Sequence, residues 1–295
     1  MKKQSREDSV DSPQIITFDA IMPPVMAVRA EASGVTRASM GLTTLLALSV
    51  LAGAFVSFGA IFATTLSAGS AELPYGVARL LFGLVFTAGL IMVVIAGAEL
   101  FTGNNLLVMA WAGGKVTTGA VLLNWALSFV GNFVGAIATA GLMFYTTQYT
   151  FGGGSVGLAA LNIASAKTSL AFIPALSLGI MCNALVCVAV WMCFSARTNI
   201  DRVVTVIPPI AAFAAAGFEH SIANIYFIPM GLFIKAGAPD SFWRAIGKTA
   251  ADFPQLTWNN FFVVNLVPVT VGNIIGGSIM VGAVYWFVYL RKERA

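Results

Sequence analysis

Two short motifs bring an acid, an amide and hydrogen-bond donors together in an otherwise apolar sequence. Residues 97–104 read GAELFTGN and residues 217–224 read GFEHSIAN, so both fit the pattern G-x-E-x-x-x-x-N. Glycine and polar residues at this spacing interrupt a helix, and an interrupted helix exposes free backbone N–H groups at a positive dipole end. Such ends attract anions. The motifs therefore predict a site that binds a small anion through hydrogen bonds.

Thr102 adds a hydroxyl donor to the first motif and His220 adds a titratable donor to the second. A lone histidine is usually a satisfied core residue, but His220 is the only histidine, follows an acid and lies in a helix interruption. An ionisable residue in a membrane-like apolar segment is a functional hypothesis by default. Its ordinary pKa of about 6.5 suits proton transfer near neutral pH. We favour a functional role for His220.

Glu99 and Glu219 allow two interpretations. An acid in hydrocarbon costs roughly 2.5–3.5 kcal/mol even on the mild insertion scale, so each carboxylate needs compensation. In the structural interpretation, each carboxylate accepts backbone N–H bonds and holds its interruption in shape. In the alternative, the two acids relay protons. We favour the structural interpretation, and both remain open.

The composition excludes most other classes of protein. Of the 295 residues, 58% are apolar and only 9% are charged, whereas soluble domains carry about 25% charged residues. The mean hydropathy is +0.87. These values exclude a soluble enzyme, a nucleic-acid-binding protein and a disordered chain, and they indicate a polytopic membrane protein. The net charge of +4 is attributed to loops that orient the chain in the bilayer.

The cysteines and the histidine exclude common metal and haem sites. Cys182, Cys187 and Cys193 lie in one apolar segment without CxxC spacing, which predicts packing roles. One histidine cannot supply both axial ligands of a haem b. The sequence also has no recognisable nucleophile–base pair, metal cluster or cofactor motif. We therefore expect no enzymatic activity and no cofactor.

Long charge-free stretches predict the membrane-spanning elements. A spanning helix needs about 20 apolar residues. Uninterrupted helices are expected near 41–66, 119–146, 170–196 and 263–290. The segments near 76–112 and 203–236 contain the two motifs, and each is interpreted as one broken span because either half alone is too short to cross about 30 Å.

A second pair of motifs indicates an internal repeat. Residues 131–135 (GNFVG) in the third helix match residues 272–276 (GNIIG) in the sixth. Three helices per repeat is an odd number, so the second repeat is inverted relative to the first. The predicted fold class is an all-α polytopic membrane protein with six transmembrane helices, built as two inverted three-helix repeats with broken second and fifth helices. Such repeats place a transport pathway at their interface.

Small and polar residues in these helices predict close packing. The paired glycines of both GNxxG motifs are small-xxx-small pairs that let helices approach closely, and Asn132 and Asn183 can form hydrogen bonds between helices. Most phenylalanines are expected to face lipid or core. Phe86, Leu90 and Phe213 lie one or two turns from the interruptions, so they are candidate constrictions of a pathway.

The basic residues predict the orientation and three regions. Of 16 Lys and Arg residues, 11 fall on the side of both termini and five on the other, so both termini are expected in the cytoplasm. Residues 1–40 form a cytoplasmic tail, 41–290 one channel domain and 291–295 a C-terminal tail. No signal-peptide pattern is present at the start. Residues 18–33 predict an amphipathic helix on the cytoplasmic face, with Pro23-Pro24 at its start; a frayed tail is the alternative.

Taken together, the motifs resemble the formate–nitrite transporter family over residues 25–292. The resemblance rests on 89–102, 124–132, 179–191, 217–224 and 265–273. It is most similar to the formate-channel branch in the stretches FEHSIAN and NLVPVTVGNIIGG. Glu99 and Gly103-Asn104 depart from the Asp and Ser-Thr of some formate channels, which leaves the substrate open between formate and related anions.

The resemblance implies an aquaporin-like fold, a homopentamer with one pore per protomer, and the bacterial inner membrane. It implies that Thr102 and His220 form the central polar site, with Asn183 and Asn273 as neighbouring polar groups. It implies that apolar constrictions come from Phe86, Leu90, Leu100, Phe101, Val186 and Phe213. Lys167 matches the family's lysine in an external connection, where it would attract anions.

These expectations combine into a pH-sensitive channel for formate and similar monovalent anions. Lys167 would concentrate the anion, Thr102 and His220 would replace part of its hydration, and a proton from His220 would neutralise it for crossing, as in proton symport. One alternative is a nitrite or hydrosulfide channel of the same fold, and acetate is a further candidate substrate. The other is a membrane subunit that docks a cytoplasmic enzyme through residues 1–40. The partners are otherwise protons and the lipid bilayer, with no nucleic acid.

Overall fold

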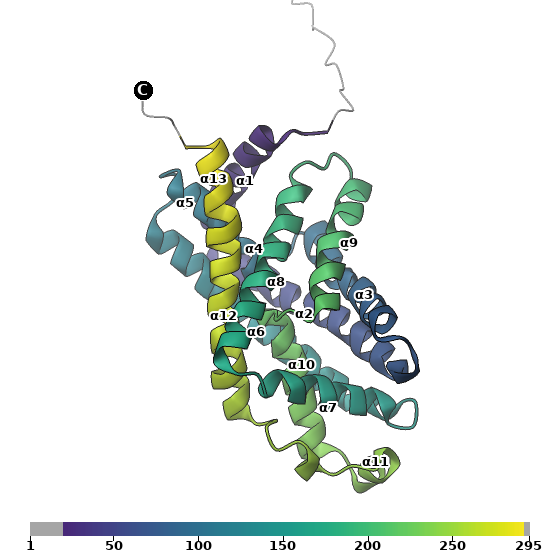
Figure 1. Ribbon diagram of the computed structural model, residues 1–295. Helices are drawn as coiled ribbons and strands as arrows, with labels where there is room; N and C mark the ends of the chain where they lie inside the picture. Colours follow the sequence, from purple (N-terminus) through teal and green to yellow (C-terminus); the bar gives the residue numbers. More distant parts are fainter. Residues whose placement is uncertain (1–19, 292–295) are drawn as a thin grey trace, which may run out of the picture.

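The computed structural model describes residues 20–291, and every regular element in that range is a helix (Figure 1). The first part contains α1 (Pro23–Ala38), α2 (Leu42–Ser67), η1 (Ser70–Glu72), α3 (Tyr75–Ala96), α4 (Phe101–Asn104), η2 (Asn105–Leu107), α5 (Val108–Ala112) and α6 (Thr118–Tyr145). The second contains η3 (Gln148–Thr150), α7 (Ser155–Thr168), α8 (Phe172–Cys193), α9 (Asn199–Ala216), α10 (Ser221–Gly237), α11 (Asp240–Ile246), η4 (Ala250–Asp252), η5 (Asn260–Leu266), α12 (Val267–Ile274), η6 (Ile275–Ala283) and α13 (Val284–Tyr289).

Six helices of the described chain are long and apolar enough to cross a bilayer: α2, α3, α6, α8, α9 and the continuous helix from η5 to α13. Four of them match the predicted uninterrupted spans, and α3 and α9 form the first halves of the two predicted broken spans. Large apolar side chains on these helices are well exposed, for example Leu122 at 57% and Ile279 at 60%. An exposed apolar surface of this kind fits a lipid environment rather than water. The prediction of an all-α, multi-span membrane protein is confirmed.

The second and fifth spans are interrupted where predicted. Helix α3 ends at Gly97 (φ 75°) and α9 ends at Gly217 (φ 78°). Glycine adopts this left-handed conformation without the Cβ clash that other residues meet, so it terminates both helices. The length argument was wrong for the second span, because α3 alone has 22 residues and is about 33 Å long at 1.5 Å per residue.

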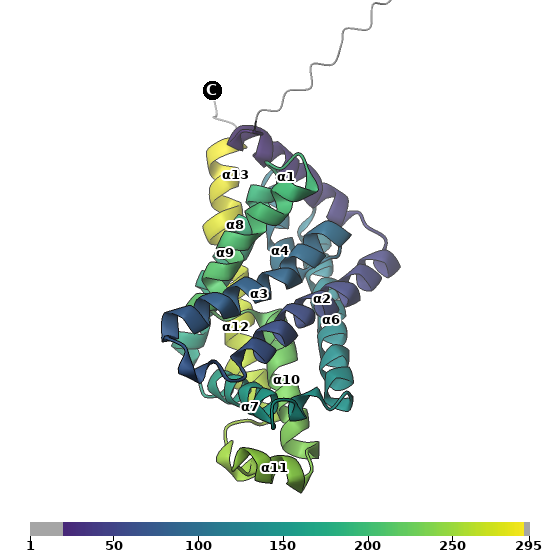
Figure 2. The same ribbon diagram turned by 90° about the vertical axis from the view of Figure 1, so that its right-hand side faces the viewer.

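The two halves share one packing scheme. Helix α2 packs against α3 and α6, and α8 packs against α9 and α12 in the corresponding way. Helix α1 and the C-terminal end of α13 lie at one face of the molecule, named here the terminal face, and α7 and α11 lie at the other, the opposite face (Figures 1 and 2). Six candidate membrane spans lie between α1 and the C-terminal end of α13, which is consistent with both lying at the same face. The arrangement matches two inverted three-helix repeats.

Glycine makes the close helix contacts possible. A Cβ added to Gly53 in α2 would lie 2.1 Å from the carbonyl oxygen of Asn132, and one added to Gly135 in α6 would lie 2.0 Å from that of Val50. In the other half, a Cβ on Gly276 would lie 2.1 Å from the carbonyl oxygen of Ile180. These distances leave no room for a methyl group, so the small residues set how closely the helices approach.

Several elements differ from the expectation. Helix α1 begins at the predicted prolines but continues to Ala38, beyond residue 33, and it packs against α5 and η2 while Glu31 pairs with Lys115. Helices α7 and α11, outside the six spans, were not predicted. The last span contains π-helical turns in η5 and η6. The tail predictions for residues 1–19 and 292–295 lie outside the described residues.

Candidate functional site

In both interruptions the backbone is a short extended segment between two helices. After Gly97, the N–H of Glu99 donates to the carbonyl of Leu48 in α2 at 3.2 Å. After Gly217, the N–H of Glu219 donates to the carbonyl of Leu178 in α8 at 3.3 Å. The extended backbone at membrane depth is therefore hydrogen-bonded to protein, which is the condition under which irregular structure survives there.

Thr102 and His220 meet at the centre of the molecule. The Oγ1 of Thr102 lies 3.0 Å from the Nε2 of His220. Thr102 is fully buried and His220 is 4% exposed. The two residues come from different interruptions, so this contact joins the two repeats at their interface.

The hydrogen bonds of His220 determine its tautomer. His220 is the N-cap of α10, and its Nδ1 accepts the N–H of Ala223 at 3.0 Å. An accepting Nδ1 carries no proton, so the proton of the neutral ring is on Nε2. Nε2–H then donates to the Thr102 oxygen. The hydroxyl proton of Thr102 is left free to donate to another acceptor.

The repeats do not supply a second pair equivalent to Thr102 and His220. The residue after Glu219 is His220, whereas the residue after Glu99 is Leu100, and both are the N-caps of the helices that follow. In the same alignment, Thr102 corresponds to Ile222. One half therefore supplies the imidazole and the other supplies the hydroxyl.

A narrow apolar cavity of about 10 Å³, room for about one water molecule, lies beside the pair. Its lining residues are Val56, Phe86, Leu90, Leu100, Val186, Ile210, Phe213 and His220. The rings of Phe86 and Phe213 meet edge to face with centroids 5.6 Å apart. Apart from His220, every side chain around this cavity is apolar, so an ion inside it would lose most of its hydration.

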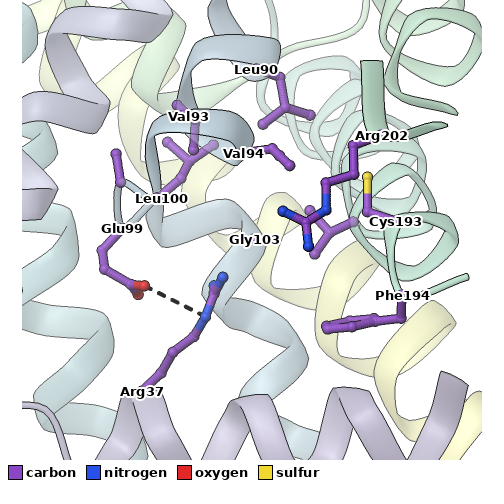
Figure 3. Close-up of a pocket in the computed structure, with 13 residues that line it drawn as sticks. Arg37, Leu90, Val93, Val94, Glu99, Leu100, Gly103, Cys193, Phe194 and Arg202 are labelled. Carbon is purple, nitrogen blue, oxygen red and sulfur yellow. Dashed lines mark ion pairs between the residues drawn. The ribbon is translucent and has the colours of Figure 1, made fainter. Parts of the chain in front are cut away.

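Two wider cavities lie on either side of the narrow one. The terminal-face cavity, about 220 Å³, shares Leu90 and Leu100 with it (Figure 3). The opposite-face cavity, about 190 Å³, shares Phe86, Phe213 and His220. These shared side chains form the apolar boundaries between the centre and the two mouths.

The remaining predicted constriction residues separate into two groups. Val186 lines the narrow cavity. Phe101 lines none of the three cavities; it packs instead against Phe129, with ring centroids 5.2 Å apart. Thr102 also lines none of them, although its hydroxyl contacts His220, which does.

Asn132 and Asn273 hold the two interruptions in place. The Oδ1 of Asn132 accepts the N–H of Phe101 at 2.8 Å, and its Nδ2 donates to the carbonyls of Ser49 and Glu99. Asn273 repeats this pattern with the N–H of Ser221 and the carbonyls of Gly179 and Glu219. Its distances are 2.9, 2.8 and 3.0 Å. Both amides bind backbone rather than project into a cavity.

Asn183 lies behind Thr102 rather than beside the cavities. Its Nδ2 is 3.2 Å from the carbonyl of Thr102, 2.8 Å from the Oδ1 of Asn105 and 2.7 Å from the carbonyl of Asn273. The thiol of Cys187 also donates to the Thr102 carbonyl, at 3.3 Å. These contacts fix the backbone that carries the Thr102 hydroxyl.

Glu99 accepts hydrogen bonds from side chains. Its Oε2 accepts from the Nδ2 of Asn104 at 2.8 Å, and its Oε1 is 3.5 Å from the Nε of Arg37. Asn104 also donates to the Oδ1 of Asn124, whose Nδ2 donates to the carbonyl of Arg37. The structural interpretation predicted backbone N–H groups as the donors to this carboxylate. In the structure the side-chain amide of Asn104 and the guanidinium of Arg37 contact it instead.

Glu219 has a corresponding hydrogen-bond network in the second half. Its Oε2 accepts from Asn224 at 2.6 Å and from Asn265 at 3.0 Å, and its Oε1 pairs with the Nζ of Lys167 at 2.7 Å. The Nδ2 of Asn265 also donates to the carbonyl of Lys167. Lys167 lies in the last turn of α7, lines the opposite-face cavity and has a side chain only 15% exposed.

Sequence reasoning missed several residues of this site. Val56 and Ile210 line the narrow cavity, and Arg37 completes the Glu99 network. The repeat offered a signal for Asn124 and Asn265, because each precedes the asparagine of its GNxxG motif by the same interval. No local motif marks Arg37, which is separated from Glu99 along the chain by both α2 and α3.

Comparisons with known proteins agree with this geometry. The family model described as formate/nitrite transporter matches residues 24–287. The formate channel FocA of Escherichia coli (strain K12) is 42% identical over 276 residues, which is 94% of this chain and 97% of that protein. A probable formate transporter of Methanothermobacter thermautotrophicus is 36% identical, over 85% of this chain and 90% of that protein.

Solved structures give the same result. A pentameric formate channel with formate bound is 44% identical and superposes with a TM-score of 0.81, covering 85% of this chain and 98% of that chain. An ion channel of the FNT family is 27% identical, with a TM-score of 0.72 and coverage of 89% and 98%. The extent of these matches shows that the chain belongs to the formate/nitrite transporter family.

Proposed function

We propose that the protein is a channel for formate and similar small monovalent anions. It lies in a bacterial inner membrane as a homopentamer, with both termini in the cytoplasm. The named function of the relatives and the pentameric state of the solved formate channel support this proposal. The observation that carries it is a hydrogen-bond donor pair, Thr102 and His220, beside a narrow apolar cavity that joins two wider mouths.

The narrow cavity sets the energetic problem of transport. A bare anion loses favourable hydration when it passes between Phe86, Leu90 and Phe213, and burial of an unpaired charge is costly. The free hydroxyl proton of Thr102 offers one charge-assisted hydrogen bond in compensation, and Nε2–H of His220 offers a second when the ring turns from Thr102 to the anion. Two such donors favour a small oxyanion.

A protonated His220 removes the charge instead of compensating it. The imidazolium transfers its proton to the carboxylate of formate, and neutral formic acid crosses the apolar boundary at a much lower desolvation cost. His220 returns to its neutral form and takes a new proton from water. Protonation occurs at Nδ1, so the cap bond from the N–H of Ala223 must open first. Proton coupling therefore disturbs the first turn of α10.

The substrate is tested by uptake of labelled formate into proteoliposomes at neutral and acidic pH, with nitrite and hydrosulfide as competitors. Protein-free vesicles correct for formic acid that diffuses through lipid. We expect saturable formate uptake that the other anions inhibit weakly. If formate is not taken up while nitrite or hydrosulfide moves rapidly, the formate proposal is wrong and the substrate is one of those anions.

The role of His220 is tested by two substitutions. His220→Asn keeps an oxygen that can accept the Ala223 N–H, so the cap of α10 is retained while titration is lost. His220→Phe removes both. In wild type, protein-dependent formate uptake should rise as the pH falls. We expect both variants to lose this rise, because neither side chain supplies the proton. A wild-type pH profile in His220→Asn would exclude the relay.

A further inference from the structure

One arginine in the terminal-face cavity has a guanidinium group without a partner. Arg202 lies in the first turns of α9, and its guanidinium points into the cavity beside Cys193 (Figure 3). Within residues 20–291, no hydrogen bond or ion pair involves this guanidinium. Arg37, the other cation of the cavity, bonds to Asn104 and pairs with Glu99.

The nearby carboxylates are engaged elsewhere. Glu99 is bound by Arg37 and Asn104. Asp201 caps α9, where its Oδ2 accepts the N–H groups of Arg197 and Thr198, each at 2.9 Å. No acid of the described chain therefore neutralises Arg202, and its N–H donors are available to a ligand.

The opposite-face cavity holds its cations differently. Arg79, which lies in the first turns of α3, donates through Nε to the carbonyl of Ala215 at 2.9 Å and through Nη2 to that of Ala214. Its guanidinium also lies 4.8 Å above the ring of Phe82. Lys167 is paired with Glu219. Both cations at that mouth are tethered, whereas Arg202 is not.

Arg202 is exposed to solvent, so a ligand can reach its guanidinium, and apolar side chains line the cavity beside it. Leu90, Val93, Val94 and Val190 line the same cavity. Charges beside apolar walls are screened less than charges on an open surface. The planar guanidinium also presents a fork of donors that matches a carboxylate or a similarly planar oxyanion with two hydrogen bonds.

We propose that Arg202 is an anion-capture site at the terminal-face mouth. It binds a carboxylate or similar oxyanion before the anion reaches Leu90 and Leu100, and it raises the apparent affinity for anions that arrive from that face only. The proposal rests on the proposed anion-channel function and adds a second binding residue to it. A passive channel gains no net pumping from this site, because the ratio of maximal rate to half-saturating concentration must be equal for the two directions. The terminal face therefore has both the lower half-saturating concentration and the lower maximal rate.

The first experiment measures formate flux separately from each face. Inside-out and right-side-out membrane vesicles carry the full-length protein, and the half-saturating formate concentration is determined in each. We expect Arg202→Gln to raise it about three- to tenfold from the terminal face, the range for one charge-assisted contact of a partly solvated group, and to leave the other face unchanged. High salt should narrow the difference between wild type and variant.

Two substitutions serve as controls. Arg202→Lys keeps the charge but loses the fork, so an intermediate value is expected. Arg291→Gln removes a positive charge near the end of α13, where Arg291 lies over the ring of Phe287, outside the cavity. It should leave both faces at wild-type values. An equal change from both faces in Arg202→Gln, or no change, overturns the proposal.

The second experiment needs no transport. Cys193 lines the same cavity, whereas Cys182 and Cys187 are fully buried. Its rates of modification by anionic and cationic methanethiosulfonates are compared, with Cys193→Ser as the blank. Both reagents use the same thiolate, so their rate ratio reports the local potential. We expect wild type to favour the anionic reagent, formate to weaken that preference, and Arg202→Gln to lower the ratio severalfold.

The outcomes separate the two proposals. If wild-type vesicles carry no formate but the thiol ratio still depends on Arg202 and on formate, the anion site stands and the formate-channel proposal fails. If formate is carried and neither the terminal-face half-saturation nor the thiol ratio depends on Arg202, the channel stands and the capture site fails.

Discussion

The Thr102–His220 contact depends on a hydrogen bond outside the pathway. The N–H of Ala223 occupies Nδ1, so the neutral ring can only donate from Nε2. The Thr102 oxygen accepts this hydrogen bond, which leaves its own hydroxyl proton free to donate to another acceptor. The helix cap thus selects the tautomer that makes both residues donors, which a buried histidine without a cap bond would not ensure.

Substitution of Thr102 tests the donor pair. Thr102→Val keeps the shape but removes the hydroxyl, so the anion loses one donor and Nε2–H loses its acceptor. A hydrogen bond to a charged group contributes about 1.5–3 kcal/mol, so formate flux at neutral pH should fall roughly tenfold to a hundredfold. Initial rates in proteoliposomes measure this, with Thr102→Ser as the control that retains the hydroxyl. A wild-type rate in Thr102→Val would refute the role.

Residue type and local context predicted Thr102 and His220 because both lie inside an interruption. The partners of the acids were not predictable in that way. The family resemblance placed Lys167 in an external connection where it would attract anions, but it did not indicate that the Lys167 ammonium contacts Glu219, which lies far along the chain. Contacts of this kind arise from the approach of α7 to α10, which no local pattern encodes.

The two acid networks differ in strength, and this difference is testable. The Lys167–Glu219 pair is 2.7 Å long with side chains 15% and 5% exposed, whereas Arg37–Glu99 is 3.5 Å with side chains 28% and 6% exposed. Removal of one partner from a buried pair costs about 3–5 kcal/mol. Lys167→Gln should therefore lower the melting temperature in detergent more than Arg37→Gln does.

Double substitutions isolate the pair energies. Lys167→Gln with Glu219→Gln should recover part of the stability lost in either single variant, because no unpaired charge remains. Arg37→Gln with Glu99→Gln provides the matched cycle. Equal coupling energies in the two cycles would contradict the ranking by burial and distance.

At the scale of elements, the breaks are held by neighbouring helices. Asn132 and Asn273 each bind one N–H and two carbonyls around the interruption, so each broken segment is anchored to two other helices. The GNxxG motifs predicted the location of these amides. Their partners became clear only from the packing. The sequence predicted hydrogen bonds between helices for Asn132, and the family resemblance placed Asn273 beside the central site, but neither indicated which backbone groups the two amides bind.

Glycine contacts predict a sharp difference within one helix. In α6, a Cβ on Gly135 would lie 2.0 Å from the carbonyl oxygen of Val50, while a Cβ on Gly141 meets nothing closer than Phe233 at 4.0 Å. Gly135→Ala should cost about 1–3 kcal/mol through overpacking. Gly141→Ala should be neutral or slightly stabilising, because alanine is the better helix former.

Thermal aggregation followed by size-exclusion chromatography measures both variants. The expected result is an earlier loss of the monodisperse peak for Gly135→Ala and an unchanged or later loss for Gly141→Ala. If the two variants behaved alike, close approach of α2 and α6 would not limit stability.

At the scale of the whole molecule, hydropathy and the repeat predicted the six spans and their inversion. They did not predict α7 and α11. These helices are short, and α11 has only seven residues with no long apolar stretch. Helix α7 contains small and polar residues such as Ser155 and Asn162, so it has neither the hydropathy of a span nor a strong amphipathic pattern. Their positions depend on tertiary packing.

The orientation of the molecule is predicted from its basic residues. Tyr145, at the opposite-face end of α6, is 82% exposed, and Ile200, at the terminal-face end of α9, is 75% exposed. A membrane-impermeant maleimide should label Tyr145→Cys in intact spheroplasts and Ile200→Cys only after permeabilisation. Each substitution is made in a protein without its three native cysteines, and that cysteine-free protein is the control for non-specific labelling. The reverse labelling pattern would place the termini outside the cytoplasm.

The unequal contribution of the two halves to the polar pair has an evolutionary consequence. Two identical halves related by a twofold axis would place the same residue after each acid, giving either two imidazoles or two leucines at the centre. In this chain Leu100 and Ile222 occupy the positions that correspond to His220 and Thr102, so a second, twofold-related His–Thr pair is not formed. A single polar pair at the centre therefore requires two halves of different sequence, which a homodimer of one repeat cannot provide and a fused, diverged duplication can.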